Sequence, residues 1–180
     1  MNIIRGIWKS YLGNIFLKLF PLFTFPSLNN LTFRLMGYRL HKSVRIFSSA
    51  RILGDLEVII GKHTFIGHET LIMGGDSRVT IGENCDISSR VCIISGSHHI
   101  DMLNVRSAGN NVGLDITIKD GVWVGFGTLI LPGVTIGEKA IIGGGSVVSK
   151  DIPAYTIAVG SPCRPIKKWN FKLNIFEEVI

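Results

Sequence analysis

Two consecutive histidines, His98 and His99, are the residues of this sequence best suited to proton transfer. An alcohol is a weak nucleophile while it keeps its proton, and a neutral imidazole can accept that proton as the oxygen attacks a carbonyl carbon. The pair stands where a regular sequence pattern gives way to the irregular run of residues 99–117. Two solvated histidines on a polar turn would look the same, so the interpretation depends on the elements that position them.

The sequence supports a metal site less well than it supports proton transfer by a histidine. The three cysteines, Cys85, Cys92 and Cys163, form no C-x-x-C pair and no zinc-binding spacing. We therefore expect no bound metal. Free cysteines without such a pattern fit a reducing compartment, and we expect a cytoplasmic protein.

Composition favours one folded domain. The chain has 180 residues, of which 46% are hydrophobic and 18% charged, and 21 are glycines. This is neither a disordered nor a collagen-like composition. The formal net charge of +6 is spread without a basic run longer than short pairs, so an anionic small ligand or a membrane surface fits it at least as well as nucleic acid. We expect no nucleic-acid partner.

A six-residue repeat organises most of the chain. An aliphatic or small residue recurs at every sixth position through Ile118, Val124, Ile130, Ile136, Ile142, Val148 and Ala154. The same frame runs through Ile60, Ile66 and Ile72, through Ile81, Ile87 and Ile93, and more weakly through Leu40, Ile46 and Ile52. This period is neither that of a helix nor that of an alternating strand, but it suits a short strand followed by a tight corner.

Three such units make one triangular coil with the recurring residues pointing inward. The frame predicts five coils, at residues 40–57, 60–77, 81–98, 118–135 and 136–153. Successive coils pair through backbone hydrogen bonds, with a rise of about 4.8 Å per coil. Equivalent positions then lie above one another, which predicts one row of Gly67, Ser88, Gly125 and Gly143 and a second row of Ser77, His98, Thr135 and Pro153.

Residues 1–39 do not follow the repeat. Ile3, Ile4, Ile7, Trp8, Leu12, Ile15, Phe16 and Leu19 mark one face of a helix. Such a segment could cap the open end of the coils or lie on a membrane surface, and we favour the cap because an exposed sheet edge needs cover. The start lacks a signal-peptide pattern, and the apolar stretch of residues 19–33 is too short to span a bilayer.

Two further segments depart from the repeat within or after it. Residues 99–117 must leave the coils as a surface excursion, and such excursions often carry function. A coil domain with this excursion is expected over residues 40–157, followed by a tail at 158–180. Basic residues in that tail could meet phosphates or could simply be solvated.

Residues 58–168 resemble the hexapeptide-repeat O-acetyltransferases that act on galactosides, maltose and polysaccharides. The resemblance is carried by the phrases PGVTIG, GGGSVVSKDIP and GSPCRPI. It implies a left-handed parallel β-helix, an exception to the usual right-handed crossover. It also implies a homotrimer with sites between subunits, acetyl-coenzyme A as co-substrate, and His98 as the general base that deprotonates the acceptor hydroxyl.

The resemblance assigns other residues as well. Asp76 matches an acid that contacts the acceptor. His99 competes with His98 for the role of general base, because the two are adjacent, and it is otherwise a possible acceptor-binding residue. The positions implied for coenzyme A are Trp123, Gly125, Phe126, Gly143, Gly144, Ser149, Lys150, Arg164 and Lys167. Phe126 and Gly144 depart from the commonest residues of the family.

The sequence leaves several functions open. Our preferred hypothesis is a sugar O-acetyltransferase of capsule, exopolysaccharide or O-antigen biosynthesis, acting on a sugar or lipid-linked saccharide, with residues 1–39 as the candidate for peripheral contact with the inner face of the membrane. A soluble small-sugar acetyltransferase is the nearest alternative. A γ-carbonic-anhydrase-like zinc enzyme is another alternative, with His63, His68 and His98 as the candidate zinc ligands. The order of these histidines along the chain differs from that family. A non-catalytic scaffold would bind no coenzyme A.

Overall fold

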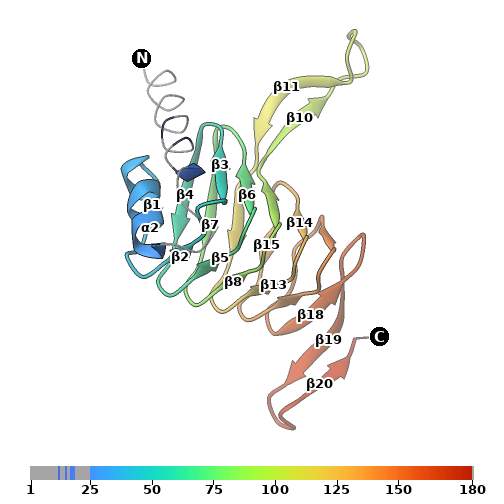
Figure 1. Cartoon of the computed structure of the whole chain (residues 1–180). Helices are drawn as coiled ribbons and strands as arrows, with labels where there is room; N and C mark the ends of the chain where they lie inside the picture. The colour runs from blue at the N-terminus through green and yellow to red at the C-terminus, as the bar shows by residue number, and fades with distance from the viewer. Residues whose placement is uncertain (1–11, 13–14, 16, 19–24, 180) are drawn as a thin grey trace.

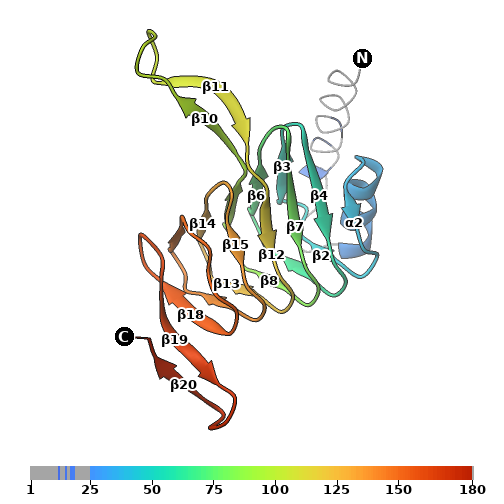
Figure 2. The ribbon, with the colours of Figure 1, turned by 180° about the vertical axis from the view of Figure 1, so that it is seen from behind.

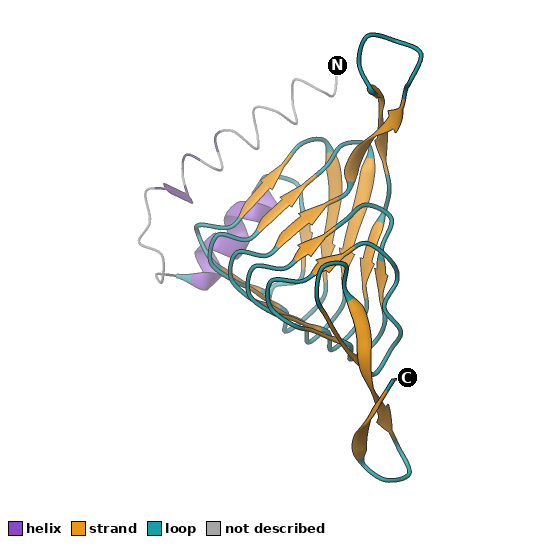
Figure 3. Cartoon of the chain, turned by 90° about the vertical axis from the view of Figure 1, so that its right-hand side faces the viewer, coloured by secondary structure: helices purple, strands orange, loops and turns teal. Residues whose placement is uncertain are grey.

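The computed structural model describes residues 12, 15, 17–18 and 25–179. Three parallel sheets form the three sides of a solenoid with a triangular cross-section, as Figures 1 and 3 show. Sheet 1 contains β1 (Arg39–Leu40), β4 (Leu56–Ile60), β7 (Ser77–Ile81), β12 (Ile116–Ile118) and β15 (Thr135–Ile136). Sheet 3 contains β3 (Arg51–Leu53), β6 (Leu71–Met73), β9 (Cys92–Ile94), β14 (Leu129–Ile130) and β17 (Val147–Val148).

Sheet 2 lies between these two along the chain and is longer. Its parallel strands are β2 (Arg45–Ile46), β5 (Phe65–Ile66), β8 (Asp86–Ile87), β13 (Trp123–Val124), β16 (Ile141–Ile142) and β18 (Thr156–Val159). The antiparallel strands β19 (Arg164–Asn170) and β20 (Ile175–Glu178) then extend it. The segment predicted as a tail therefore continues sheet 2, and it ends in a hairpin at the bottom of Figure 1.

The strand register confirms the period of six. In sheet 1 the residues Leu40, Ile60, Ile81, Ile118 and Ile136 pair in succession. In sheet 3 the corresponding series is Ile52, Ile72, Ile93, Ile130 and Val148. All ten side chains are buried. Stacking like residues in one column gives each coil the same interior shape, so the core is continuous along the solenoid.

The repeat frame fails at its last predicted position. Ile152 bridges Ile136, and Ala158 pairs with Ile142, so these two residues take the inward positions instead of Ala154. Ile152 is 3% exposed and Ala158 is fully buried. The shift arises earlier, between Val148 and Ile152, because the chain turns there from sheet 3 into the last turn of sheet 1 with fewer residues than at the preceding corner from Ile130 to Ile136.

Of the two predicted rows, one is confirmed and one is wrong. The N–H groups of Gly67, Ser88, Gly125 and Gly143 each donate to the inward residue of the next coil, as stacking requires. In the other row, Thr135 pairs with Thr117 and Ser77 pairs with Leu56. His98 lies outside the coil altogether, because the chain leaves sheet 3 after β9 and does not turn into sheet 1.

The excursion is a β-hairpin rather than an irregular loop. Its strands are β10 (Gly96–Ile100) and β11 (Ala108–Gly113), which pair antiparallel. It begins before the predicted boundary at residue 99, and the coil resumes at Ile116. Figures 1 and 2 show that it projects away from the edge where sheets 3 and 1 meet.

The N-terminal end of the coils carries the helix α2 (Pro26–Leu35). Phe33 is fully buried, and the amide of Asn29 donates to the carbonyl of Ile46 at 3.1 Å. This part of residues 1–39 therefore caps the first coil, as expected. Most of the helical face predicted over Ile3–Leu19 lies outside the described residues. Among the residues that the structure describes, no helix has the length and hydrophobicity needed to span a bilayer.

Candidate active site

His98 is held on the first strand of the hairpin by a backbone hydrogen bond. Its Nδ1 lies 3.0 Å from the carbonyl oxygen of Gly109 on the returning strand. A carbonyl oxygen can only accept, so Nδ1 carries the proton in this hydrogen bond. In the neutral ring the lone pair is then on Nε2, which is the form that a proton acceptor needs.

A cavity of about 680 Å³ lies next to His98. Its walls come from the corners of two successive coils and from both strands of the hairpin: Met73, Gly74, Gly75, Asp76, Ile94, Gly96, Ser97, His98, Asn111, Val112 and Gly113. The volume falls within the range typical of small-molecule sites. Two predicted residues therefore line one cavity, although His98 lies on the hairpin and Asp76 on a corner of the coils.

Glycine at position 113 allows the hairpin to approach this corner closely. A Cβ at Gly113 would lie 2.3 Å from the carbonyl oxygens of both Gly75 and Asp76. Any larger residue would push β11 away from the corner. The position of the hairpin over Asp76 thus depends on the lack of a Cβ atom at Gly113.

Of the two residues assigned to the acceptor, Asp76 lines this cavity and His99 does not. Asp76 is exposed, and its backbone has a positive φ of 47°. The register of the hairpin shifts between His98 and Ile100. Asn111 pairs directly with His98 and does line the cavity. Asn111 was not among the assigned site residues, because its role depends on hairpin register, which the sequence does not specify.

Five of the positions assigned to coenzyme A gather at the corner where sheet 2 turns into sheet 3. They are Trp123, Gly125, Phe126, Gly143 and Gly144. The rings of Trp123 and Phe126 are 53% and 56% exposed. A Cβ at Gly125 would lie 2.5 Å from the nitrogen of Gly144. The corner is therefore a bare backbone edge beside two exposed aromatic rings, a surface that a thin flexible chain can lie against.

The other four positions lie elsewhere in the chain. Ser149 and Lys150 follow β17, at the corner between sheets 3 and 1 and two coils beyond β9, while Arg164 and Lys167 belong to β19. Lys167 forms an ion pair with Glu178 at 3.1 Å. A single chain therefore does not gather the whole assigned set around His98.

One basic residue near the aromatic corner was missed by the sequence reasoning. The guanidinium of Arg90 lies 5.8 Å from the centre of the Phe126 ring, and its Nε donates to Glu69 at 2.6 Å. This hydrogen bond from Arg90 lowers the pKa of Glu69. Arg90 and Phe126 come from successive coils, so only the stacking brings them together.

The cysteines are poor candidates for chemistry. Cys85 is 2% exposed, and its thiol donates to the carbonyl of Lys119 at 3.1 Å. Burial raises the pKa of Cys85, Cys92 and Cys163, which favours the protonated thiol over the nucleophilic thiolate.

The three histidines considered for zinc lie apart. His68 bonds to Ser49 at 2.7 Å and to Glu69 at 3.2 Å on the corner between sheets 2 and 3. His63 lies on the corner between β4 and β5, and His98 is on the hairpin. Within the described part of the chain, no three such side chains are grouped so that they could hold a metal ion.

Comparison with known protein families identifies the repeat. Residues 115–150 match the family model described as bacterial transferase hexapeptide (six repeats). The galactoside O-acetyltransferase of Escherichia coli is 40% identical over 111 residues, which make up 62% of this chain and 54% of that protein. The chain spans about half the length of the curated relatives it matches.

Solved structures share the solenoid. A maltose O-acetyltransferase from Clostridium difficile 630 is 28% identical with a TM-score of 0.65, covering 91% of this chain and 87% of that chain. The polySia specific acetyltransferase NeuO is 33% identical with a TM-score of 0.56, covering 76% and 64%. The N-acyltransferase AntD from Bacillus cereus, solved with dTDP and 3-hydroxybutyryl-CoA, shares the fold at 23% identity and a TM-score of 0.64, covering 80% and 90%.

Proposed function

We propose that the protein is a hexapeptide-repeat acetyltransferase that transfers an acetyl group from acetyl-coenzyme A to a sugar hydroxyl. Residues 115–150 match the bacterial transferase hexapeptide model, and the chain is similar to a galactoside O-acetyltransferase and a maltose O-acetyltransferase. The observation that carries this proposal is the imidazole of His98. It lies in a cavity of about 680 Å³ with its Nδ1 bonded to the carbonyl of Gly109. A ring oriented in this way offers Nε2 to a substrate hydroxyl.

The reaction needs no covalent enzyme intermediate. Nε2 of His98 accepts the hydroxyl proton while the sugar oxygen attacks the thioester carbonyl. The tetrahedral intermediate then collapses, the C–S bond breaks, and the proton passes from His98 to the departing sulfur of coenzyme A. Asp76 accepts a hydrogen bond from the sugar and orients the reacting hydroxyl.

The bare corner between sheets 2 and 3 is the proposed place for the pantetheine arm. Gly125, Gly143 and Gly144 let that arm approach the backbone, and Trp123 and Phe126 flank it. Lys150 and Arg164 are exposed and form no ion pair within the described chain, so they are free to meet phosphate oxygens. Ser149 and Lys167 complete the proposed set, Lys167 by exchanging Glu178 for a phosphate.

A homotrimer would bring these two parts together. From β6 to β17 the outward face of sheet 3 is apolar, with Leu71, Cys92, Leu129 and Val147 in register and only half-buried, whereas β3 contributes Arg51 to the same row. Accessible apolar faces of this kind mark protein interfaces. This face borders the cavity, because Met73 and Ile94 line both. A second copy packed here would present its own surface beside His98.

For the acceptor we propose a saccharide of capsule, exopolysaccharide or O-antigen biosynthesis. NeuO, whose name specifies polySia, supports the polymeric form of the acceptor but not its charge, whereas the galactoside and maltose relatives support a small sugar. A cytoplasmic enzyme with its N-terminal segment at the inner face of the membrane would meet lipid-linked saccharides.

A direct test measures thiol release from acetyl-coenzyme A in the presence of single sugars and oligosaccharides. Mass spectrometry then identifies the acetylated product. Transfer to a sugar with release of one thiol per ester supports the proposal. If the protein binds coenzyme A but acetylates only amines, the O-acetyltransferase assignment fails. If it binds no coenzyme A, the enzyme assignment fails and the scaffold reading replaces it.

A further inference from the structure

A second hollow adjoins the cavity of His98 and is not used by the proposed reaction. It has a volume of about 500 Å³ and is lined by Asp55, Leu56, Glu57, Asp76, Ser77, Arg78 and Asp115. Asp76 lines both hollows. The two hollows are therefore neighbours that meet at Asp76, and together they are here named the corner groove, which extends from His98 along the edge between sheets 3 and 1 toward the first coil.

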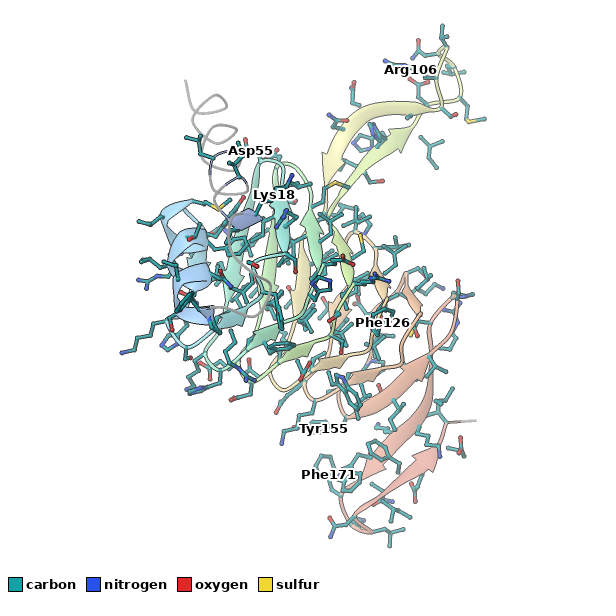
Figure 4. The ribbon with its side chains drawn as sticks, in the orientation of Figure 1. Lys18, Asp55, Arg106, Phe126, Tyr155 and Phe171 are labelled. Atoms are coloured by element: carbon teal, nitrogen blue, oxygen red, sulfur yellow. The ribbon has the colours of Figure 1, made fainter. Side chains whose placement is uncertain are left out.

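Stacking of the coils sets the direction of this groove. The N–H of Asp76 donates to the carbonyl of Asp55 at 2.7 Å, so the two residues occupy the same place on successive coils. Their separation along the axis is about 4.8 Å, the spacing of paired strands. Figure 4 labels Asp55 on the edge of the solenoid from which the hairpin projects.

The far end of the groove is built around a fixed arginine. The side-chain Nε of Arg78 donates to the carboxylate of Glu57 at 2.7 Å. The backbone N–H of Arg78 donates to the carboxylate of Asp115, also at 2.7 Å. Arg39 adds a second bond to Glu57 at 2.8 Å. The hydrogen bonds from Arg39 and Arg78 lower the pKa of Glu57, so the carboxylate stays ionised and holds Arg78 in place.

Two carboxylates remain free to bind. The side chains of Asp55 and Asp76 are exposed and form no hydrogen bond or ion pair within the described chain. An ionised carboxylate is a strong acceptor for the hydroxyl groups of a sugar. Each hollow by itself has the volume of a small-ligand site, so the corner groove has room for more than the one sugar that receives the acetyl group.

We infer that the corner groove is an extended acceptor site, in which the sugar next to the acetylated one lies between Asp55 and Arg78. This inference rests on the proposed function and adds to it the class of acceptor: an uncharged oligosaccharide or polysaccharide. The carboxylates of Asp55, Glu57, Asp76 and Asp115 outnumber the single guanidinium that lines the hollow. A sugar carboxylate would be repelled there, whereas hydroxyl groups would find acceptors.

The test compares acceptors of increasing length with acetyl-coenzyme A as donor. Glucose, maltose and maltotetraose serve as one neutral series, and galactose with galacto-oligosaccharides as a second. For the wild type, kcat/KM should rise about tenfold or more from the single sugar to the longer members, the size expected of a hydrogen bond to a charged group. Asp55→Ala should remove this rise and leave the value for the single sugar near that of the wild type.

Glu83→Ala is the matched control. Glu83 is also a surface carboxylate, but it pairs with Lys62 at 3.0 Å on the corner between sheets 1 and 2. This variant should keep the dependence on length. Melting curves of both variants should match the wild type, because both side chains lie at the surface. Oligosaccharides of a uronic acid, at matched length, should have a lower kcat/KM than the neutral ones.

The failures of the two proposals are distinguishable. Acetyl transfer with the same kcat/KM for all lengths, or preferred transfer to the uronic-acid series, overturns the extended site and leaves the sugar O-acetyltransferase standing. The extended site is also overturned if Asp55→Ala lowers kcat/KM by the same factor for single and for longer sugars. Absence of transfer to every sugar, with coenzyme A bound, sinks both.

Discussion

At the scale of single residues, the hydrogen bond from His98 to Gly109 is the central feature of the site. It selects one tautomer of the imidazole and one orientation of the ring. The neighbouring His99 has no such hydrogen bond within the described chain and does not line the cavity. The choice between the two adjacent histidines stays a prediction, which substitution of each can test.

His98→Ala should lower acetyl transfer by about 10²–10⁴-fold, the effect expected for loss of a general base. Coenzyme A binding, measured by calorimetry, should stay close to the wild type because the ring lies on the acceptor side. His99→Ala is the control and should cost much less. Reversed effects would move the base to His99, and two small effects would disprove the mechanism.

Gly113→Ala tests whether the hairpin must touch the corner of Asp76. The added Cβ would lie 2.3 Å from two carbonyl oxygens, so the backbone has to shift. We expect a loss of about 1–3 kcal/mol in the free energy of unfolding, as for other overpacked sites, together with a higher KM for the acceptor.

Gly75→Ala is the stability control for this substitution, because a Cβ at Gly75 meets nothing within 4 Å. Thermal melting should separate the two variants. A Gly113→Ala protein that melts like the wild type and keeps its acceptor KM would show that the close approach is not needed.

At the scale of elements, the β10–β11 hairpin supplies the cavity residues that the repeated coils do not provide. Its base supplies His98 and Asn111 to the cavity, and its tip extends beyond the coils, as the position of Arg106 in Figure 4 shows. The side chains of Met102, Leu103 and Val105 at the tip are 78%, 99% and 103% exposed. The tip thus presents three apolar side chains to its surroundings, and we propose that it contacts the acceptor or a second copy.

Replacing residues 101–107 with a short Gly-Ser turn tests the tip without removing the site. The bonds from Leu103 and Asn104 to Asp101 are internal to the tip, so the coils should melt as before. The acceptor KM should rise and acetyl transfer should fall, while hydrolysis of acetyl-coenzyme A stays equal or increases, because a lid excludes water and orients the acceptor.

The control shortens the turn at residues 172–174 between β19 and β20, which is also exposed. Steady-state kinetics with each substrate varied in turn would separate the two deletions. If loss of residues 101–107 leaves acceptor kinetics unchanged, the tip is only a tolerated insertion. A loss of the assembled state would make it an assembly element instead.

At the scale of the whole molecule, the proposed catalytic residue and the proposed coenzyme A surface lie at two different corners. His98 lies at the corner between sheets 3 and 1, whereas Trp123 and Phe126 lie at the corner between sheets 2 and 3. Sheet 3, with its apolar outward face, separates these two corners. Packing of one copy against the sheet 3 face of another would unite His98 with the coenzyme A surface of a neighbour.

Sedimentation should therefore report a trimer that survives moderate dilution. Leu129→Lys places a charge in the middle of the sheet 3 face and should give monomers with little acetyl transfer. Thr117→Lys, on the outward face of sheet 1, is the control and should remain trimeric. Circular dichroism should show that both variants keep the coils. Monomers with full activity would contradict a site shared between subunits.

The sequence by itself determined the solenoid, because its information is local and repeated. Each coil buries the same three positions, so the spacing of Ile60, Ile81 and Ile118 predicts their stacking without knowledge of distant contacts. The same count was wrong for His98, which it placed in the last position of a coil, whereas the chain leaves sheet 3 after β9 and His98 lies on the hairpin. It was also wrong at Ala154, because the corner between Val148 and Ile152 is shorter than a fixed period of six assumes.

Only the tertiary structure decided how the residues outside the repeat meet. The antiparallel register of the hairpin places Asn111 opposite His98, and the stacking of coils places Arg90 beside Phe126 and Asp55 beside Asp76. No periodic signal marks these pairs, because each joins segments that leave the coil at a corner. The period fixes what points into the core, whereas the path of the chain between coils decides which surface residues become neighbours.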